Sequence, residues 1–154
     1  MSSFNTLVAA LRRGDVVNNI RGQSPTETLS AFVKTLRLPV SLDRKALAKA
    51  LEERESLATT ALGFGFAIPH PRKRVMEGEE RAIVGIAYLE HPVEWGDPEG
   101  KPVGVLFLVL SGGEDQHLSL LSEIASLAEN LEFRKFIAGN PQKEEILAYL
   151  SASA

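Results

Sequence analysis

Two kinds of hydrophobic pattern alternate along this chain. Hydrophobic residues spaced three and four positions apart are typical of helices with one buried face, and they predict helices over residues 4–13, 24–38, 42–55, 115–131 and 141–150. Short continuous hydrophobic runs are typical of buried strands, and they predict strands at residues 16–20, 66–69, 82–89 and 103–110. Because helices and strands alternate with short connections, we expect an α/β or α+β domain.

Capping residues mark several of the predicted helix ends. Ser24, which a proline follows, is an expected N-cap, and Glu27 completes a capping box with it. Pro39 is expected to end the helix that Ser24 begins. Asp115 and Asn140 are the predicted N-caps of two later helices.

Length and hydrophobic content suit one domain. The chain has 154 residues, of which 44% are hydrophobic, enough to form a buried core. We expect a single domain over residues 1–154 with its core at about 15–150. Residues 1–14 are read as an N-terminal extension that packs loosely or mediates self-association. The segment 91–101 has two prolines and two glycines, so we expect a turn-rich connection in which Trp95 is a partly buried anchor.

The composition of the chain favours some binding partners and cellular compartments and excludes others. The formal net charge of −3 lacks the positive surplus that nucleic-acid binding requires, and the short basic cluster 72–74 suits a protein partner better. The chain has no cysteine, which excludes thiol chemistry and Cys-zinc sites. No hydrophobic run reaches the roughly 18 residues that cross a bilayer, and the N-terminus does not resemble a signal peptide. We therefore expect a cytoplasmic protein that is not inserted in a membrane.

His70 is the most informative residue of the chain, because it lies between Pro69 and Pro71. Each proline fixes its own φ and restricts the residue before it, so the backbone on both sides of the histidine is stiff. The prolines also lack N–H donors, so the strand before them should not continue a sheet ladder. Gly63 and Gly65, just upstream, permit a tight turn. We expect the imidazole to project in a defined direction.

Imidazole suits reversible phosphoryl transfer, because it is largely neutral and nucleophilic at cellular pH. A phosphoryl group on nitrogen needs hydrogen-bond donors nearby, since the transfer is assisted by positioning and electrostatics. Arg54 offers a planar guanidinium that matches phosphate oxygens. His117 falls in the first turn of a predicted helix, where the helix dipole favours an anion. His117 is expected either to donate to the phosphoryl group or to orient the ring of His70.

Each of these residues also has an ordinary structural reading. Taken alone, a Pro-His-Pro segment is more often a rigid surface loop than a catalytic site. Arg54 stands among glutamates and can be explained as a solvated charge. His117 can be explained as a residue that starts a helix. Thr59 and Thr60 are expected to serve a turn or strand start rather than a phosphate. His91 is assigned no role.

The ordered motifs resemble a known family. Residues 51–55, 59–60 and 63–70 resemble the signature Leu-x-x-Arg-Glu … Ser-Thr-Gly-x-Gly-x-Gly-x-Ala-x-Pro-His of the mannitol/fructose/nitrogen-type enzyme IIA proteins of the bacterial sugar phosphotransferase system. Similar matches follow at residues 105–111, 117–121 and 131–134. The resemblance covers roughly residues 15–150. It implies an α/β fold with a mixed β-sheet sandwiched by helices.

The resemblance also implies roles for individual residues. His70 matches the histidine that carries the phosphoryl group, and Arg54 and His117 match the residues that support the phosphorylation site. It implies no cofactor and no metal. The chain departs from the family pattern at Ala61, Phe64, Phe66 and Pro71. These changes make the surface beside His70 more apolar and stiffer than the family pattern, which bears on the identity of the partner more than on the chemistry.

The main hypothesis is a phosphotransferase component with no independent small-molecule turnover. His70 takes a phosphoryl group from a histidine-containing phosphocarrier protein and passes it to an enzyme IIB domain or holds it as a regulatory signal. The stand-alone chain favours the nitrogen-type regulatory branch. The alternative is an interaction module that transfers nothing and whose partner binding is switched by the charge of phosphorylated His70. A metal-dependent enzyme is a third reading, against which the absence of a tight ligand spacing counts.

Overall fold

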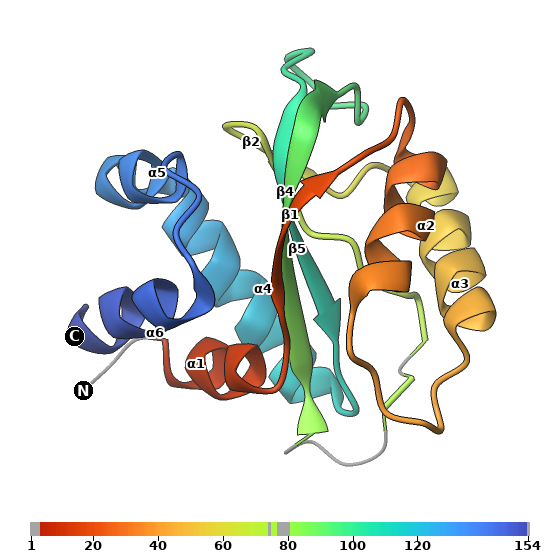
Figure 1. Cartoon of the computed structure of the whole chain (residues 1–154), viewed down its shortest axis with the longest axis horizontal. Helices are drawn as coiled ribbons and strands as arrows, with labels where there is room; N and C mark the ends of the chain where they lie inside the picture. Colours follow the sequence, from red (N-terminus) through yellow and green to blue (C-terminus); the bar gives the residue numbers. More distant parts are fainter. Residues whose placement is uncertain (1–3, 74, 77–80, 154) are drawn as a thin grey trace.

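A five-stranded mixed sheet lies between two layers of helices in the computed structural model, which describes residues 4–73, 75–76 and 81–153 (Figure 1). The strands are β1 (Val16–Ile20), β2 (Ala61–Gly63), β3 (Phe66–Ala67), β4 (Ile83–Val93) and β5 (Val103–Leu110). The helices are α1 (Asn5–Arg12), α2 (Pro25–Thr35), α3 (Arg44–Leu57), α4 (Glu114–Glu129), α5 (Leu131–Ile137) and α6 (Lys143–Ala152). The expected α/β fold with a mixed sheet sandwiched by helices is confirmed.

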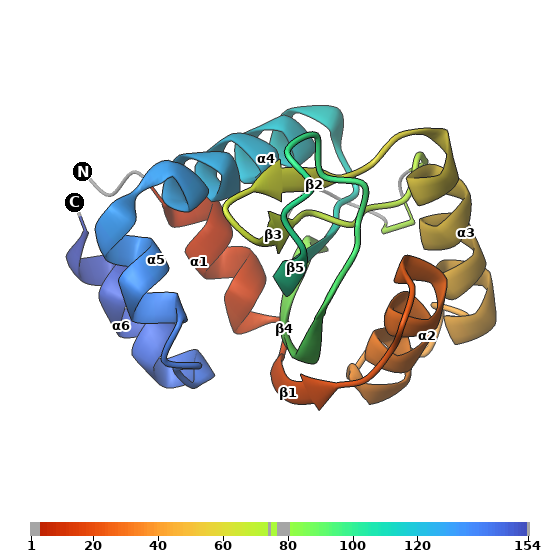
Figure 2. The ribbon, with the colours of Figure 1, turned by 90° about the horizontal axis from the view of Figure 1, so that it is seen from above.

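The strand order is β1-β4-β5-β3-β2. β1 runs parallel to β4, and β3 runs parallel to β5, whereas the pairs β4–β5 and β2–β3 are antiparallel. The central strand β5 is largely buried on both faces, as its continuous hydrophobic run predicted, and residues 83–88 of its neighbour β4 are buried as well. Figure 2 shows the edge strand β2 beside α4, with the chain entering it from α3.

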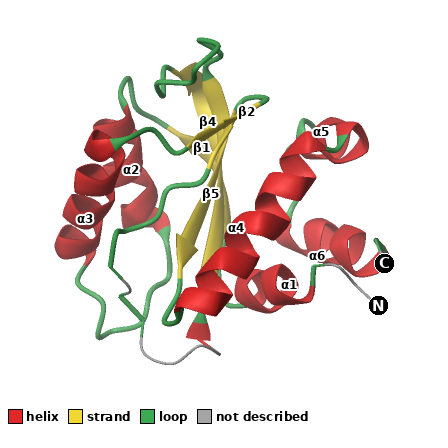
Figure 3. Cartoon of the chain, turned by 180° about the vertical axis from the view of Figure 1, so that it is seen from behind, coloured by secondary structure: helices red, strands yellow, loops and turns green. Residues whose placement is uncertain are grey.

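Each face of the sheet has its own hydrophobic core. Side chains of β5 alternate: Leu106 and Leu108 face the layer of α2 and α3, and Phe107 and Val109 face the other layer. That other layer contains α1, α4, α5 and α6, and Figure 3 shows α1 and α6 next to each other beside α4. The two cores therefore hold the sheet from both sides and position the strand ends where the candidate site lies.

The N-terminal helix belongs to the core, so the expectation of a loosely packed extension is wrong. Leu7 and Leu11 of α1 are buried against α4, α6 and β4. The N–H of Leu7 donates to the carboxylate of Glu123 in α4 at 3.0 Å. A mildly hydrophobic segment looks like an optional extension in the sequence, but here it packs against β4 of the sheet and against α4 and α6.

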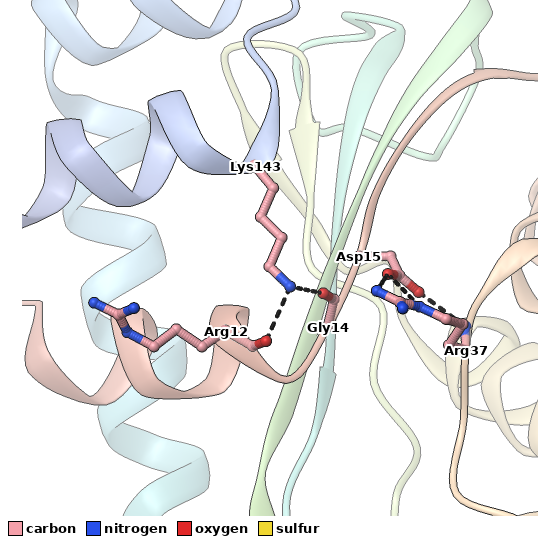
Figure 4. A network of polar contacts seen from close by, with 5 residues as sticks. All are labelled: Arg12, Gly14, Asp15, Arg37 and Lys143. Atoms are coloured by element: carbon pink, nitrogen blue, oxygen red, sulfur yellow. Dashed lines mark hydrogen bonds and ion pairs between the residues drawn. The ribbon is translucent and has the colours of Figure 1, made fainter.

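A polar network at the start of β1 connects the two helical layers (Figure 4). The Lys143 ammonium of α6 donates to the carbonyl oxygens of Arg12, at 2.9 Å, and Gly14, at 2.7 Å. A lysine at the C-terminal end of α1 is favourable because the last carbonyls of a helix lack partners. Asp15 then accepts three hydrogen bonds from Arg37, which follows α2.

Several predicted boundaries shift for local reasons. The N-cap of α4 is Gly113, two residues before Asp115. Asn140 adopts a left-handed conformation (φ 54°) after α5 and does not cap α6, whose N-cap is Gln142. Ser24 does cap α2, and its hydroxyl accepts from the N–H of Glu27. The Glu27 carboxylate accepts from Gln23, one residue before the expected capping-box partner.

Three other expectations need correction. Helix α2 ends at Thr35, before Pro39, because Leu36 turns into an extended conformation and buries its side chain. Residues 91–93 continue β4 rather than starting a loop, since Val93 pairs with Val103 across a register shift. Trp95 is fully buried rather than partly buried, with 2% of its surface exposed.

Candidate functional site

The backbone that leads to His70 is held on both sides. The parallel ladder between β3 and β5 ends at Ala67, two residues short of the predicted strand end, because Pro69 offers no N–H to continue it. The Ile68 N–H donates to Thr60 O at 3.0 Å, and the Val109 N–H donates to Pro69 O at 3.0 Å. The stiff segment predicted around His70 is thus fixed against β5.

The His70 ring is fixed by its own backbone. Its Nδ1 lies 2.8 Å from the carbonyl oxygen of Ile68. A carbonyl can only accept a hydrogen bond, so Nδ1 carries the proton in this contact. The neutral ring then has its lone pair on Nε2, which is the nucleophilic nitrogen. The sequence indicated a rigid histidine but not which nitrogen is available.

His117 lies beside His70. It stands in the first turn of α4, as predicted, and its N–H donates to Gly113 O at 3.0 Å. The two imidazole rings meet edge to face, with centroids 4.9 Å apart and an interplanar angle of 63°. The Nδ1 atom of His117 lies 3.3 Å from the hydroxyl oxygen of Ser111, which follows β5. Sequence reasoning missed Ser111, because nothing in its neighbourhood distinguishes it from a turn serine.

Arg54 completes the group from the opposite helical layer. It stands in the last turn of α3, and its Nη1 donates to Ala58 O at 2.8 Å, just beyond the helix end. Arg54 and His70 line the same cavity of about 260 Å³, whose other walls come from β2, Thr59, Thr60 and the middle of α4. The structure therefore brings together the three side chains that the sequence singled out.

The hydroxyls of Thr59 and Thr60 are already occupied by structural hydrogen bonds. Thr59 donates to the carbonyl oxygen of Trp95. The Thr60 hydroxyl and N–H both donate to the Glu55 carboxylate, at 2.7 and 2.6 Å. The indole N–H of Trp95 donates to the Thr60 hydroxyl at 3.4 Å. These contacts tie the end of α3, and with it Arg54, to β2, which agrees with the turn role expected for the two threonines.

Burial and positive charge keep both histidines neutral. Burial is the largest cause that lowers the pKa of His70 below its ordinary value of 6.5, and the charges of Arg54 and His117 lower the pKa further. The hydrogen bond to Ile68 opposes this change. Burial, followed by the charge of Arg54, also lowers the pKa of His117. Nε2 of His70 therefore keeps its lone pair at neutral pH.

This electrostatic arrangement predicts the titration of His70. We expect the midpoint of the His70 titration, followed by the imidazole signals in an NMR titration, to lie below the ordinary value of 6.5. Folded protein binds this proton less readily than unfolded protein, so His70 reduces stability as the pH falls below about 6.5. In Arg54→Gln the pKa of His70 should rise, because a nearby positive charge is removed.

The matched control for that titration is Arg21→Gln. Arg21 follows β1 at the opposite edge of the sheet and pairs with Glu90 at 2.7 Å. This change should leave the titration of His70 where it is in the wild-type protein. Equal titration curves for Arg54→Gln and wild type would contradict the electrostatic role of Arg54.

A basic cleft lies on the other side of His117. It has a volume of about 440 Å³ and is lined by Pro71, Arg72, Lys73, Val109, Ser111, Gly113, Glu114 and His117. Arg72 and Lys73 are exposed. The third residue of the predicted basic cluster, Arg74, lies outside the described residues.

Large hydrophobic side chains are exposed on elements that contribute to the site. Leu118 follows His117 and is 57% exposed, and Leu57 ends α3. Phe64 stands at the turn between β2 and β3 with φ 58°, and the Arg134 guanidinium lies 4.2 Å from the centre of its ring. The apolar character that Phe64 was expected to add is therefore on the surface, where it is 44% exposed.

The described residues offer neither a metal cluster nor a membrane-crossing helix. Within residues 4–73, 75–76 and 81–153, no three His, Asp or Glu side chains are grouped as a metal ion requires. In the same ranges, no helix has the length and hydrophobicity needed to span a membrane.

Known proteins share this sequence pattern. A nitrogen regulatory protein of Pseudomonas aeruginosa is 29% identical over 140 residues, which is 88% of this chain and 88% of that protein. Multiphosphoryl transfer protein 2 of Escherichia coli is 34% identical over 97 residues, or 63% of this chain. The chain matches only 11% of the length of that larger protein.

Solved structures share the fold. The crystal structure of nitrogen regulatory protein IIA-Ntr from Neisseria meningitidis matches with a TM-score of 0.80 and 27% identity, over 94% of this chain and 98% of that one. The complex of enzyme IIA-mannitol with phosphorylated enzyme IIB-mannitol from Escherichia coli matches with a TM-score of 0.64 and 16% identity, over 90% and 94% of the two chains, which shows a shared fold alone. The family model described as phosphoenolpyruvate-dependent sugar phosphotransferase system, EIIA 2, matches residues 10–153, and this chain belongs to that family.

Proposed function

We propose that this protein is a cytoplasmic phosphocarrier that accepts a phosphoryl group on Nε2 of His70. The observation that carries the proposal is the contact between Nδ1 and the Ile68 carbonyl, which leaves Nε2 as the nucleophile beside Arg54 and His117. The donor is a histidine-containing phosphocarrier protein. The group then passes to an enzyme IIB domain or is held as a regulatory signal.

The transfer needs no cofactor, because the bond that forms is matched by the bond that breaks. The lone pair of His70 Nε2 forms a new N–P bond while the donor's P–N bond breaks and its electron pair stays on the donor nitrogen. His70 keeps its Nδ1 proton, so the phosphorylated ring carries a positive charge that the Ile68 carbonyl stabilises. The Arg54 guanidinium stabilises the negative charge that develops on the phosphoryl oxygens. His117 donates a hydrogen bond to the same group.

The nitrogen-type regulatory branch is favoured over a sugar-specific subunit. A relative that matches over 88% of both chains is a nitrogen regulatory protein, and so is the structural neighbour with a TM-score of 0.80. The IIA-mannitol complex with IIB-mannitol supports a IIB domain as an acceptor for this fold. These likenesses also support a second function, in which phosphorylation only switches partner binding through its added charge.

The test uses the purified full-length protein and the phosphorylated phosphocarrier protein as donor. We expect intact-mass analysis to show one added phosphoryl group that is lost in acid and retained in base, as a phosphoramidate bond requires. NMR of the ¹⁵N-labelled imidazoles should place the group on Nε2 of His70. The proposal is contradicted if the protein gains no phosphoryl group from a competent donor, or gains it on a residue other than His70. The switch-only function predicts that phosphorylated wild type passes no phosphoryl group to a IIB domain, and that His70→Ala, which cannot be phosphorylated, still binds its partner.

A further inference from the structure

The hydroxyl of Ser111 lies beside a side chain of the site. Ser111 follows β5 and stands two residues before Gly113, the N-cap of α4, so it is outside the position from which a serine caps a helix. Its hydroxyl lies 3.3 Å from Nδ1 of His117. Ser111 is buried, with 6% of its surface exposed, so water competes little for this contact. The serine is thus directed toward the site.

The geometry of α4 explains why the contact forms. Side chains on a helix tilt toward its N-terminus, so a residue in the first turn reaches back over the loop that precedes the helix. His117 is in that turn and its ring meets both Ser111 in the loop and His70 after β3. The position of the His117 ring is therefore set from two sides.

The hydrogen-bonding inventory decides the direction of the contact. Neutral imidazole has one N–H and one acceptor nitrogen, and a serine hydroxyl both donates and accepts. The neighbouring Nε2 of His70 has a lone pair or, after transfer, a phosphoryl group, and either one accepts a hydrogen bond from a suitably placed donor. His117 supplies that donor only if its proton is on Nε2. Nδ1 must then accept, and the Ser111 O–H is the group beside it.

We propose that Ser111 is a positioning residue whose hydroxyl donates to Nδ1 of His117 and thereby holds the His117 proton on Nε2, directed to the phosphoryl group on His70. The inference rests on the function proposed above. The contact of 3.3 Å is long for an O–H donor, and we expect it to shorten when the phosphoryl group binds the other nitrogen. Ser111 touches no reacting atom and acts through His117.

The first test is spectroscopic and needs no phosphoryl donor. In the unphosphorylated protein, ¹⁵N NMR should show a His117 ring protonated on Nε2 with a hydrogen-bonded Nδ1. Ser111→Ala should move the Nδ1 signal to that of a free acceptor nitrogen, and Ser111→Thr, which keeps the hydroxyl, should restore it. Ser119→Ala is the matched control, since Ser119 is exposed on the same helix.

The second test measures transfer from the phosphorylated phosphocarrier protein. Ser111→Ala should slow labelling of His70 about fivefold, the effect of losing roughly one ordinary hydrogen bond, whereas Ser111→Thr and Ser119→Ala should label at the wild-type rate. Circular dichroism and thermal unfolding establish that each variant is folded. Together with the NMR change, this result would support the inference.

The outcomes separate this inference from the proposed function. The positioning role of Ser111 is overturned if Ser111→Ala is phosphorylated on His70 as fast as wild type, or if the His117 signals of this variant are unchanged. The phosphocarrier function stands in either case, provided that wild type is phosphorylated. If wild type takes up no phosphoryl group while the His117 signal still depends on Ser111, the proposed function fails. Ser111 is then a structural partner of His117 only, which also overturns the inference.

Discussion

Replacing His70 by asparagine is expected to abolish phosphoryl acceptance. The asparagine amide can still donate to the Ile68 carbonyl in place of Nδ1–H, but it offers no nucleophilic nitrogen. We expect the labelling rate with the phosphorylated phosphocarrier protein to fall by more than about 10³-fold, since no other group substitutes for a missing nucleophile. Stability should change by less than about 1.5 kcal/mol, because the backbone contact is retained. Quench-flow or timed intact-mass measurements give the rate.

His91→Asn is the matched control for this substitution. His91 is exposed on β4 and is not among the residues that line the cavity of His70. It should label at the wild-type rate. Undiminished labelling of His70→Asn would show that another residue accepts the group, with His117 the first to examine because its ring adjoins that of His70.

Replacing Gly14 by alanine is expected to destabilise the fold severely. A Cβ at this position would lie 1.9 Å from the carbonyl oxygen of Val84 and 2.7 Å from its carbon. Val84 belongs to the central strand β4, which pairs on both sides, so its backbone has little freedom to move away. Gly14 is also held by Lys143, whose ammonium donates to its carbonyl (Figure 4). Both partners resist the shift that an added methyl group would require.

We expect Gly14→Ala to lower the free energy of unfolding by about 3 kcal/mol or more, an overpacking cost at the upper end of the usual range. For a chain of this length that corresponds to a fall in Tm of roughly 6–12 °C. Urea unfolding followed by circular dichroism measures the change. Gly104→Ala is the control, because a Cβ there meets no atom within 4 Å, and it should shift stability by less than about 1 kcal/mol.

If Gly14→Ala were as stable as wild type, the close approach of Gly14 to β4 would be contradicted. That outcome would leave the site around His70 untouched, since Gly14 contributes none of the three side chains gathered there.

The candidate site was predictable to the extent that its chemistry is local. His70 was identifiable because two prolines stiffen its backbone, and an ordered family motif supplied Arg54 and His117. The hydrogen bonds that orient these groups were not predictable. Ile68 fixes the His70 tautomer and Ser111 contacts His117 through geometry that arises only when β3, β5 and α4 pack together.

The sequence by itself determined the alternation of helices and strands, the doubly buried character of β5 and the stiffness around His70, because these properties depend on neighbouring residues. Only the tertiary structure decided that α1 is part of the core, that β4 extends to Val93 and that Trp95 is buried. Contacts such as Leu7 with Glu123 join residues 116 positions apart. The periodicity of the sequence cannot predict such a contact. The free energy of the contact depends on surfaces that exist only after the sheet and both helical layers have assembled.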